Sequence, residues 1–201
     1  MRQTLITKLN IDWVEIKNAC RLTTNKEDTS SIPTSEFKTK LLISEHSPIR
    51  LGEIVFVWKT IKSWVATHFA RHWIGWEKWI STQRADRTKV NRDESPQGTE
   101  VTMKVKSNPQ SLINVSKVRL CFQASPETRE KMEDLKISIK ESGEEEVSLV
   151  MQPQCVYRCG CSEFQSCGYW QRFVKEYGHE DLYDIATRYR LADEYFYKRV
   201  K

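Results

Sequence analysis

The sequence predicts an α+β fold in which helices pack on a short sheet of mixed or antiparallel strands. Short apolar or alternating stretches at residues 2–9, 53–59 and 101–105 predict strands, and longer stretches between and after them have helical spacing. The 201 residues are enough for one well-buried domain. We expect residues 1–140 to form that domain and residues 141–201 to form a cysteine-rich C-terminal extension that closes it as a cap.

Two capped helices are expected in the first quarter of the chain. Asp12 can accept hydrogen bonds from the free N–H groups of a helix that runs to about Arg21. Thr34 or Ser35 can cap a second helix, which ends before Pro48 because proline disfavours helical geometry in the residue before it.

The remaining elements follow from periodicity and charge. From Ile61 apolar side chains recur at helical spacing, and His68 and His72 lie on the same stripe. Pro126 suits the first turn of a helix. The expected elements are a charged loop at 82–98, helices at 108–122 and 126–140, an acidic link at 141–146, a cysteine-rich turn region and a helix at 180–198 whose Leu191, Tyr195 and Phe196 face inward.

Composition and charge exclude several classes of protein. A 10% aromatic content argues against disorder, and a net charge of 32 − 27 = +5 favours anionic partners such as nucleotides without indicating a polynucleotide. No apolar run is long enough to cross a membrane, and the first residues lack the apolar core of a signal peptide. We therefore expect a cytoplasmic protein without membrane contact, in which thiols stay reduced.

The segment from Arg71 to Arg84 indicates a nucleotide-shaped ligand. It combines two arginines with an imidazole, a hydroxyl and three tryptophans. Guanidinium forks bind phosphate oxygens in pairs, and indole rings stack on flat heterocycles. The alternative is a basic, aromatic surface helix.

A second candidate lies on the helix predicted after Asn108. At about 100° per residue, Asn108 and Arg119 fall within about 20° of each other, in the same sector as Leu112 and Val115. A buried arginine is costly without a partner, so Arg119 would need an anion or a polar ring. The alternative is an ordinary exposed arginine.

These residues resemble the motifs of the flavin-dependent thymidylate synthases, in the same order along the chain. Arg71-His72-Trp73 followed after seven residues by Ser81 is similar to the family's R-H-R-x7-S. Residues 108–129 are similar to N-x-R-S-L-x-N-F-x-x-x-R followed by A-Q-x-E-I-R. Upstream, His46-Ser47-Pro48 resembles H-x-S-P, and residues 18–21 resemble A-A-R-x-S.

The resemblance implies the fold of the thymidylate synthase-complementing proteins and a role for each matching residue. Arg71, His72 and Trp73, with His46, Asn108 and Asn114, would contact FAD in the region where folate also approaches. Arg119 would hold the uracil ring of dUMP in a forked hydrogen bond. Ser81 would lie beside the reacting pyrimidine, with Gln83 and Arg84 near the nucleotide. Ser81 and Arg119 would then be the catalytic pair.

The family implies an enzyme that methylates dUMP to dTMP with methylenetetrahydrofolate and NADPH, as a homotetramer with flavin sites between subunits. The chain departs from the family at Trp73, where the signature has arginine, and at Gln83, where arginine usually follows the serine. Residues 85–107 lack the family's E-x-x-R-x-x-L-P stretch. Another C5 modification of a pyrimidine nucleotide on the same scaffold is therefore an alternative. A zinc-stabilised basic module that binds nucleic acid is the non-catalytic alternative.

Four cysteines near the C-terminus form a separate candidate site. Cys155, Cys159, Cys161 and Cys167 have the spacing C-x3-C-x-C-x5-C, and four thiolates are a common ligand set for structural zinc. Redox chemistry and unliganded thiols in a compact turn are the alternatives. The family's pattern has no such element, so this segment is an addition to it.

Overall fold

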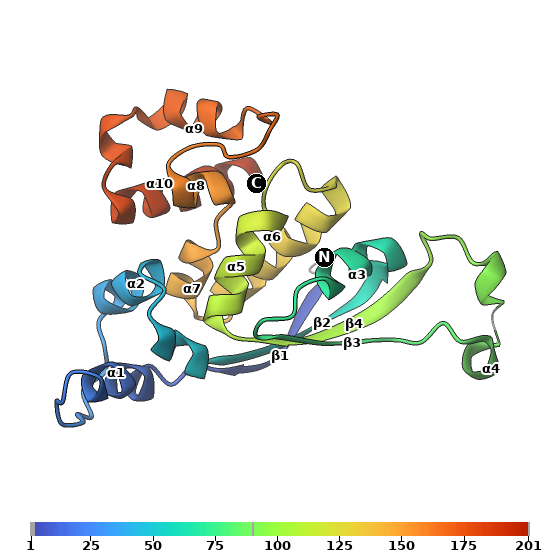
Figure 1. Cartoon of the computed structure of the whole chain (residues 1–201), viewed down its shortest axis with the longest axis horizontal. Helices are drawn as coiled ribbons and strands as arrows, with labels where there is room; N and C mark the ends of the chain where they lie inside the picture. The colour runs from blue at the N-terminus through green and yellow to red at the C-terminus, as the bar shows by residue number, and fades with distance from the viewer. Residues whose placement is uncertain (1–2, 90, 201) are drawn as a thin grey trace.

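The computed structural model describes residues 3–89 and 91–200 and shows a four-stranded antiparallel sheet in the order β1-β2-β4-β3, with helices stacked over one of its faces (Figure 1). The predicted α+β fold is confirmed. Of the strand predicted at 2–9, residue 2 lies outside the described residues. The strands are β1 (Thr4–Asn10), β2 (Glu53–Lys62), β3 (Trp76–Ile80) and β4 (Glu100–Ser107).

The helices fall into three groups along the chain. Before β2 come α1 (Trp13–Leu22), α2 (Ser35–Ile43) and the 3-10 turn η1 (Ser47–Leu51). Between β2 and β4 lie α3 (Ser63–Ala70), α4 (Ala85–Thr88) and η2 (Arg92–Glu94). After β4 follow α5 (Pro109–Arg119), α6 (Pro126–Glu141), α7 (Glu145–Val150), α8 (Gln154–Arg158), α9 (Tyr169–Tyr177), η3 (Glu180–Leu182) and α10 (Ile185–Val200).

The predicted caps are present at both early helices. Asp12 accepts hydrogen bonds from the backbone N–H groups of Val14 and Glu15, each at 3.0 Å. Of the two possible caps of α2, Thr34 is the one used, since its hydroxyl accepts from the N–H of Phe37.

Alternation along β4 divides the sheet into a covered and an open face. Val101, Met103 and Val105 are buried toward the helices, whereas Lys104 and Lys106 are exposed. The covered side forms a core rich in aromatic rings, with Phe56, Trp58, Phe69 and Trp76 fully buried.

The chain between β3 and β4 forms an arm that extends away from the body of the molecule (Figure 1). The prediction of a charged loop at 82–98 holds for most of the arm, although α4 and η2 form short turns within it and residue 90 lies outside the described residues. Strand β3 itself was not expected. Its residues pair with β4 from Trp76–Ser107 to Ile80–Met103.

The C-terminal residues pack on the rest of the chain and share its core, which runs from Trp13 to Tyr195. The Nζ of Lys136 on α6 donates to a carboxylate oxygen of Asp193 on α10 at 2.6 Å, and both residues are buried. Helix α7 begins inside the predicted acidic link, and α9 was not expected. The division into two parts at residue 140 stays a prediction. None of the helices in the described ranges is long and apolar enough to span a bilayer.

Candidate functional site

Three segments meet around the imidazole of His72. The Nε of Arg119, at the end of α5, donates to His72 Nε2 at 2.9 Å, and an Nη of Arg119 donates to the carbonyl of His68 at 2.6 Å. From β3, Lys78 Nζ donates to the carbonyl of His72 at 2.6 Å. Arg71 is the C-cap of α3 and lies close enough to Arg119 to lower the pKa of its guanidinium. We call Arg71, His72, Lys78 and Arg119 the cation cluster.

Electrostatics keep the imidazole neutral and the cluster strongly positive. Burial, with the charges of Arg119 and Lys78, lowers the pKa of His72 to about 4, so its Nε2 can accept from Arg119 at neutral pH. Burial and the nearby Arg71 also lower the pKa of Arg119. In residues 3–89 and 91–200, no ion pair joins Arg71, Lys78 or Arg119 to a carboxylate. Positive charge without a protein counterion suits an anionic ligand.

A cavity of about 440 Å³ opens at the other end of α5. Amide side chains dominate its polar lining, with Asn108, Gln110 and Asn114 on α5 or its cap. A neighbouring cavity of about 330 Å³ shares Arg50, Gly75 and Asn108 with it. We call the two together the amide cavity. Its size is typical of small-molecule sites, and amides offer both donors and acceptors to a heterocycle.

Local geometry fixes the wall of this cavity. The side chain of Asn108 accepts from the N–H of Ser111, and the hydroxyl of Ser111 accepts from the N–H of Asn108, which makes a capping box at the start of α5. Gly75 has φ of +63°, and a Cβ there would lie 2.7 Å from the Asn108 amide nitrogen. The turn before β3 therefore needs glycine to approach the cap.

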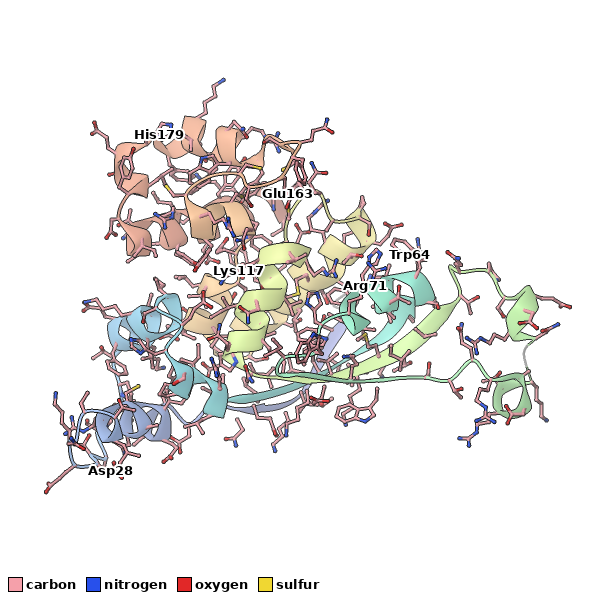
Figure 2. All side chains as sticks on the ribbon, in the orientation of Figure 1. Asp28, Trp64, Arg71, Lys117, Glu163 and His179 are labelled. Carbon is pink, nitrogen blue, oxygen red and sulfur yellow. The ribbon has the colours of Figure 1, made fainter. Side chains whose placement is uncertain are left out.

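Glu45 lines the cavity and binds two side chains of α5. Its carboxylate accepts from Gln110 Nε2 and from Lys117 Nζ, each at 2.5 Å. The second amide atom of Gln110, Oε1, is buried and has no hydrogen-bond partner among the residues that the structure describes. Lys117 also lies 3.8 Å from the centroid of the Tyr157 ring, so α8 of the C-terminal region supports this charge pair. Figure 2 shows Lys117 on α5 below α8, and Arg71 on the far side of α5.

Glu45, Lys78 and Gln110 were not predicted as members of a site. Gln110 occupies the position at which the family's N-x-R-S-L pattern has arginine, and this match could have marked it as a candidate site residue.

The remaining predicted residues lie elsewhere in the protomer. Ser81 and Gln83 line a separate cavity of about 140 Å³ at the base of the arm. Ser81 Oγ accepts from the N–H of Thr102 at 3.0 Å, and Arg84 is exposed and paired with Asp86. Ser81 follows Gly75 by six positions along the extended chain of β3, which places the two residues about 20 Å apart.

The structure thus brings part of the predicted site together. Arg71, His72 and Arg119 meet in the cation cluster, and Asn108 and Asn114 line the amide cavity. The arm residues Ser81, Gln83 and Arg84 share neither place within one protomer. His46 and Trp73 are exposed and are absent from the lining of the amide cavity. The roles of all these residues stay predictions.

The four predicted zinc ligands do not form a metal site as they stand. Among the described residues, no group of three or more His, Cys, Asp or Glu side chains is arranged to hold an ion. Cys159 lies apart from the predicted set, because its sulfur contacts the carbonyl of Leu182 at 3.8 Å. The predicted ligand set Cys155, Cys159, Cys161 and Cys167 stays a prediction.

The fold resembles that of solved proteins, whereas the sequence has no detectable relative in two other comparisons. No protein-family model and no curated protein matches the chain. Among solved structures, the UMP/dUMP methylase PolB from Streptomyces cacaoi, crystallised with 5-bromo-dUMP, matches with a TM-score of 0.56 and 12% identity. The match covers 69% of this chain and 89% of that one. At such low identity the likeness shows a common fold.

Proposed function

We propose that the chain is an enzyme that methylates C5 of a pyrimidine nucleotide with the help of a flavin. dUMP is the proposed substrate, methylenetetrahydrofolate the one-carbon donor and NADPH the source of electrons, as in the family that the motifs resemble. One observation carries the proposal: the signature residues Arg71 and His72 meet Arg119, from a motif 47 residues later, in a cation cluster that forms no ion pair with a carboxylate of residues 3–89 and 91–200. The shared fold with a UMP/dUMP methylase supports it.

The cation cluster suits the nucleotide end of such a site. Arg119 uses only part of its five N–H donors on His72 and His68, so its guanidinium can still bind a uracil ring or a phosphate. Neutral His72 accepts from Arg119 and fixes its orientation, and Lys78 holds the backbone of His72. Such fixed donors can stabilise negative charge on a pyrimidine without moving during the reaction.

The amide cavity suits the ring of a flavin. Asn108, Gln110 and Asn114 line the cavity, and such amides can pair with the alternating carbonyl and N–H groups of its pyrimidine edge. When bound, a flavin supplies hydride chemistry that amides and guanidinium groups lack. The residues of this chain would bind it, orient it and exclude water.

The arm residues reach such a site only from another subunit. Ser81 and Gln83 lie about 20 Å along β3 from the turn at Gly75, too far to touch a ligand in the amide cavity of their own chain. The extended arm projects from the body and is free to reach a neighbour (Figure 1). We therefore propose an oligomer, a tetramer by family resemblance, in which the arm completes a neighbouring site.

Mixing two inactive variants tests this arrangement. Arg119→Ala removes the cation cluster of a protomer, and the double change Ser81→Ala and Arg84→Ala removes its arm contribution. After subunit exchange, sites that combine an intact cluster with an intact arm should restore activity. Exchanged oligomers that stay inactive would contradict a shared site.

A product assay tests the reaction itself. Purified protein is incubated with dUMP or UMP, several one-carbon donors and NADPH, and the nucleotide is analysed by mass spectrometry. The proposal predicts a mass increase of one methyl group on dUMP. A different C5 adduct would favour the alternative modification enzyme. Salt-sensitive binding of polynucleotide with no nucleotide product would favour the nucleic-acid module.

A further inference from the structure

Four of the six cysteines gather from two distant parts of the chain. Cys121 lies in the turn between α5 and α6, and Cys155 lies on α8. Cys161 and Cys167 lie in the loop that connects α8 to α9. All four are free thiols that are buried or half-buried. The proposed function uses none of them.

Two contacts place the two segments side by side. Gln123 Nε2 donates to the carbonyl of Gln165 at 2.6 Å, which joins the α5–α6 turn to the α8–α9 loop. The rings of Phe122 and Tyr169 lie 5.4 Å apart, centroid to centroid. Residues 121–123 therefore run beside residues 165–169, the segment that carries Cys167.

A tight turn separates Cys159 from the other thiols. The N–H of Gly160 donates to the carbonyl of Cys155 at 2.9 Å, and Cys159 has a left-handed φ of +55°. The chain thus reverses after α8 and returns Cys161 toward Cys155. The thiol of Cys159 instead contacts the carbonyl of Leu182 at 3.8 Å, on the side of η3.

The thiols are also within electrostatic reach of one another. Burial first, and then the neighbouring Cys121, Cys167 and Cys161, raise the pKa of Cys155 to about 12. The pKa of Cys121 is raised by burial first and then, among other groups, by Cys167 and Cys161. Cys159 is absent from both sets of neighbours.

We propose that Cys121, Cys155, Cys161 and Cys167 bind one zinc ion as four thiolates and fasten the α8–α9 loop to the α5–α6 turn. In the present conformation the sulfurs are not arranged to hold an ion. Rotation of a cysteine side chain between staggered positions moves its sulfur by about 3 Å, which is one way in which the four thiols can approach a common ion. Binding releases the thiol protons to solvent as zinc–sulfur bonds form.

This centre has a consequence for the end of α5. Cys121 follows Arg119 by two residues, so a zinc ion there would fix the turn that ends the helix of the cation cluster. The proposal does not depend on the proposed function, because a structural zinc would be present whether or not the protein methylates a nucleotide.

Metal analysis of full-length variants tests the ligand set. The protein is purified without chelators or metal-affinity tags and its metals are counted by mass spectrometry. We expect one zinc per wild-type chain and a loss of at least about 10-fold in bound zinc for Cys121→Ser, since one ligand is removed. Cys159→Ser is the matched control and should keep its zinc. Zinc retained in Cys121→Ser but lost in Cys159→Ser would overturn the assignment.

X-ray absorption on the wild-type protein covers the case in which Cys121→Ser does not fold. The proposal predicts a zinc edge with sulfur neighbours alone, at about 2.3 Å. Nitrogen or oxygen neighbours, iron with inorganic sulfide, or wild-type protein without bound metal would each overturn it.

Discussion

Arg119 is the side chain on which the proposed nucleotide site most depends. Its Nε is held by His72 and one Nη by the carbonyl of His68, so the guanidinium is oriented before a ligand arrives. Preorganised, charge-assisted donors give stronger and more directional binding than mobile ones. Arg119 is half-buried, lies near the positive charge of Arg71 and forms no ion pair with a carboxylate of the described residues. Because a buried charge is costly without a counterion, this arrangement suits an anionic ligand as the partner of Arg119.

Arg119→Ala should raise the dissociation constant for dUMP by about 10- to 100-fold, because one charged hydrogen-bond group is worth about 1.5–3 kcal/mol. Titration calorimetry measures the affinity. Arg21→Ala is a suitable control, since Arg21 donates to the carbonyl of Glu27 on the surface, far along the chain from the cluster. Unchanged dUMP affinity in Arg119→Ala would remove Arg119 from the site.

His72 should titrate near pH 4. Its pKa in the folded protein is about 4, below the ordinary value of 6.5, so the unfolded chain takes up the proton first as pH falls. The contribution to stability is complete above pH 6.5 and is lost progressively toward pH 4. NMR of the imidazole gives the pKa directly. His72→Gln should show a shallower loss of stability in this range, and equal slopes would refute the assignment.

Among the secondary-structure elements, β3 and the turn before it shape the amide cavity. Gly75 combines a positive φ with a contact to the Asn108 side chain that leaves no room for a Cβ. Gly75→Ala should therefore destabilise the fold by about 1–2 kcal/mol from the left-handed backbone alone, with a further cost from the clash at the cap. Thermal unfolding measures this. Gly98→Ala is the matched control, because a Cβ at Gly98 has no atom within 4 Å.

Helices with caps and regular apolar spacing were predictable, and two kinds of element were not. The capped helices α1 and α2 and the alternating strand β4 follow from local signals. Strand β3 was missed because its tryptophans form a strand through pairing with β4, a long-range interaction that local spacing does not encode. Helix α9 was not predicted, although it is strongly amphipathic, because it follows directly on the cysteine-rich loop that was expected to form a turn region.

The same limit applies to the candidate site. The motifs identified Arg71, His72 and Arg119, which meet, because each motif preserves local spacing. The positions of Ser81 and Gln83 at the other end of β3 depend on the sheet register, and so could not be read from the motifs. Cys121 could not be predicted as a partner of the C-terminal thiols, because Cys155 follows it by 34 positions and only tertiary contacts join the two segments.

At the scale of the whole molecule, a buried ion pair connects the C-terminal helix α10 to α6. Lys136 on α6 is fully buried, and its Nζ donates to Asp193 on α10 and to the carbonyl of Ser148. The pair ties α7 and α10 to α6. Through Tyr157 and Lys117 the same region reaches Glu45 at the floor of the amide cavity.

Asp193→Asn should destabilise the protein by about 3–5 kcal/mol, because it leaves the Lys136 ammonium buried without a counterion. Chemical denaturation measures the free energy of unfolding. Glu176→Gln, which breaks the exposed pair with Lys198, should change it little. Similar effects of the two substitutions would show that the buried pair does not hold the C-terminal region in place.

The visible absorbance spectrum of the purified protein, recorded before and after addition of dUMP, tests the proposed flavin–nucleotide site most directly. The account predicts the two bands of an oxidised flavin in the wild-type protein and in Arg119→Ala, and a shift of these bands on adding dUMP to the wild type alone. A colourless protein that also fails to take up added FAD would contradict it.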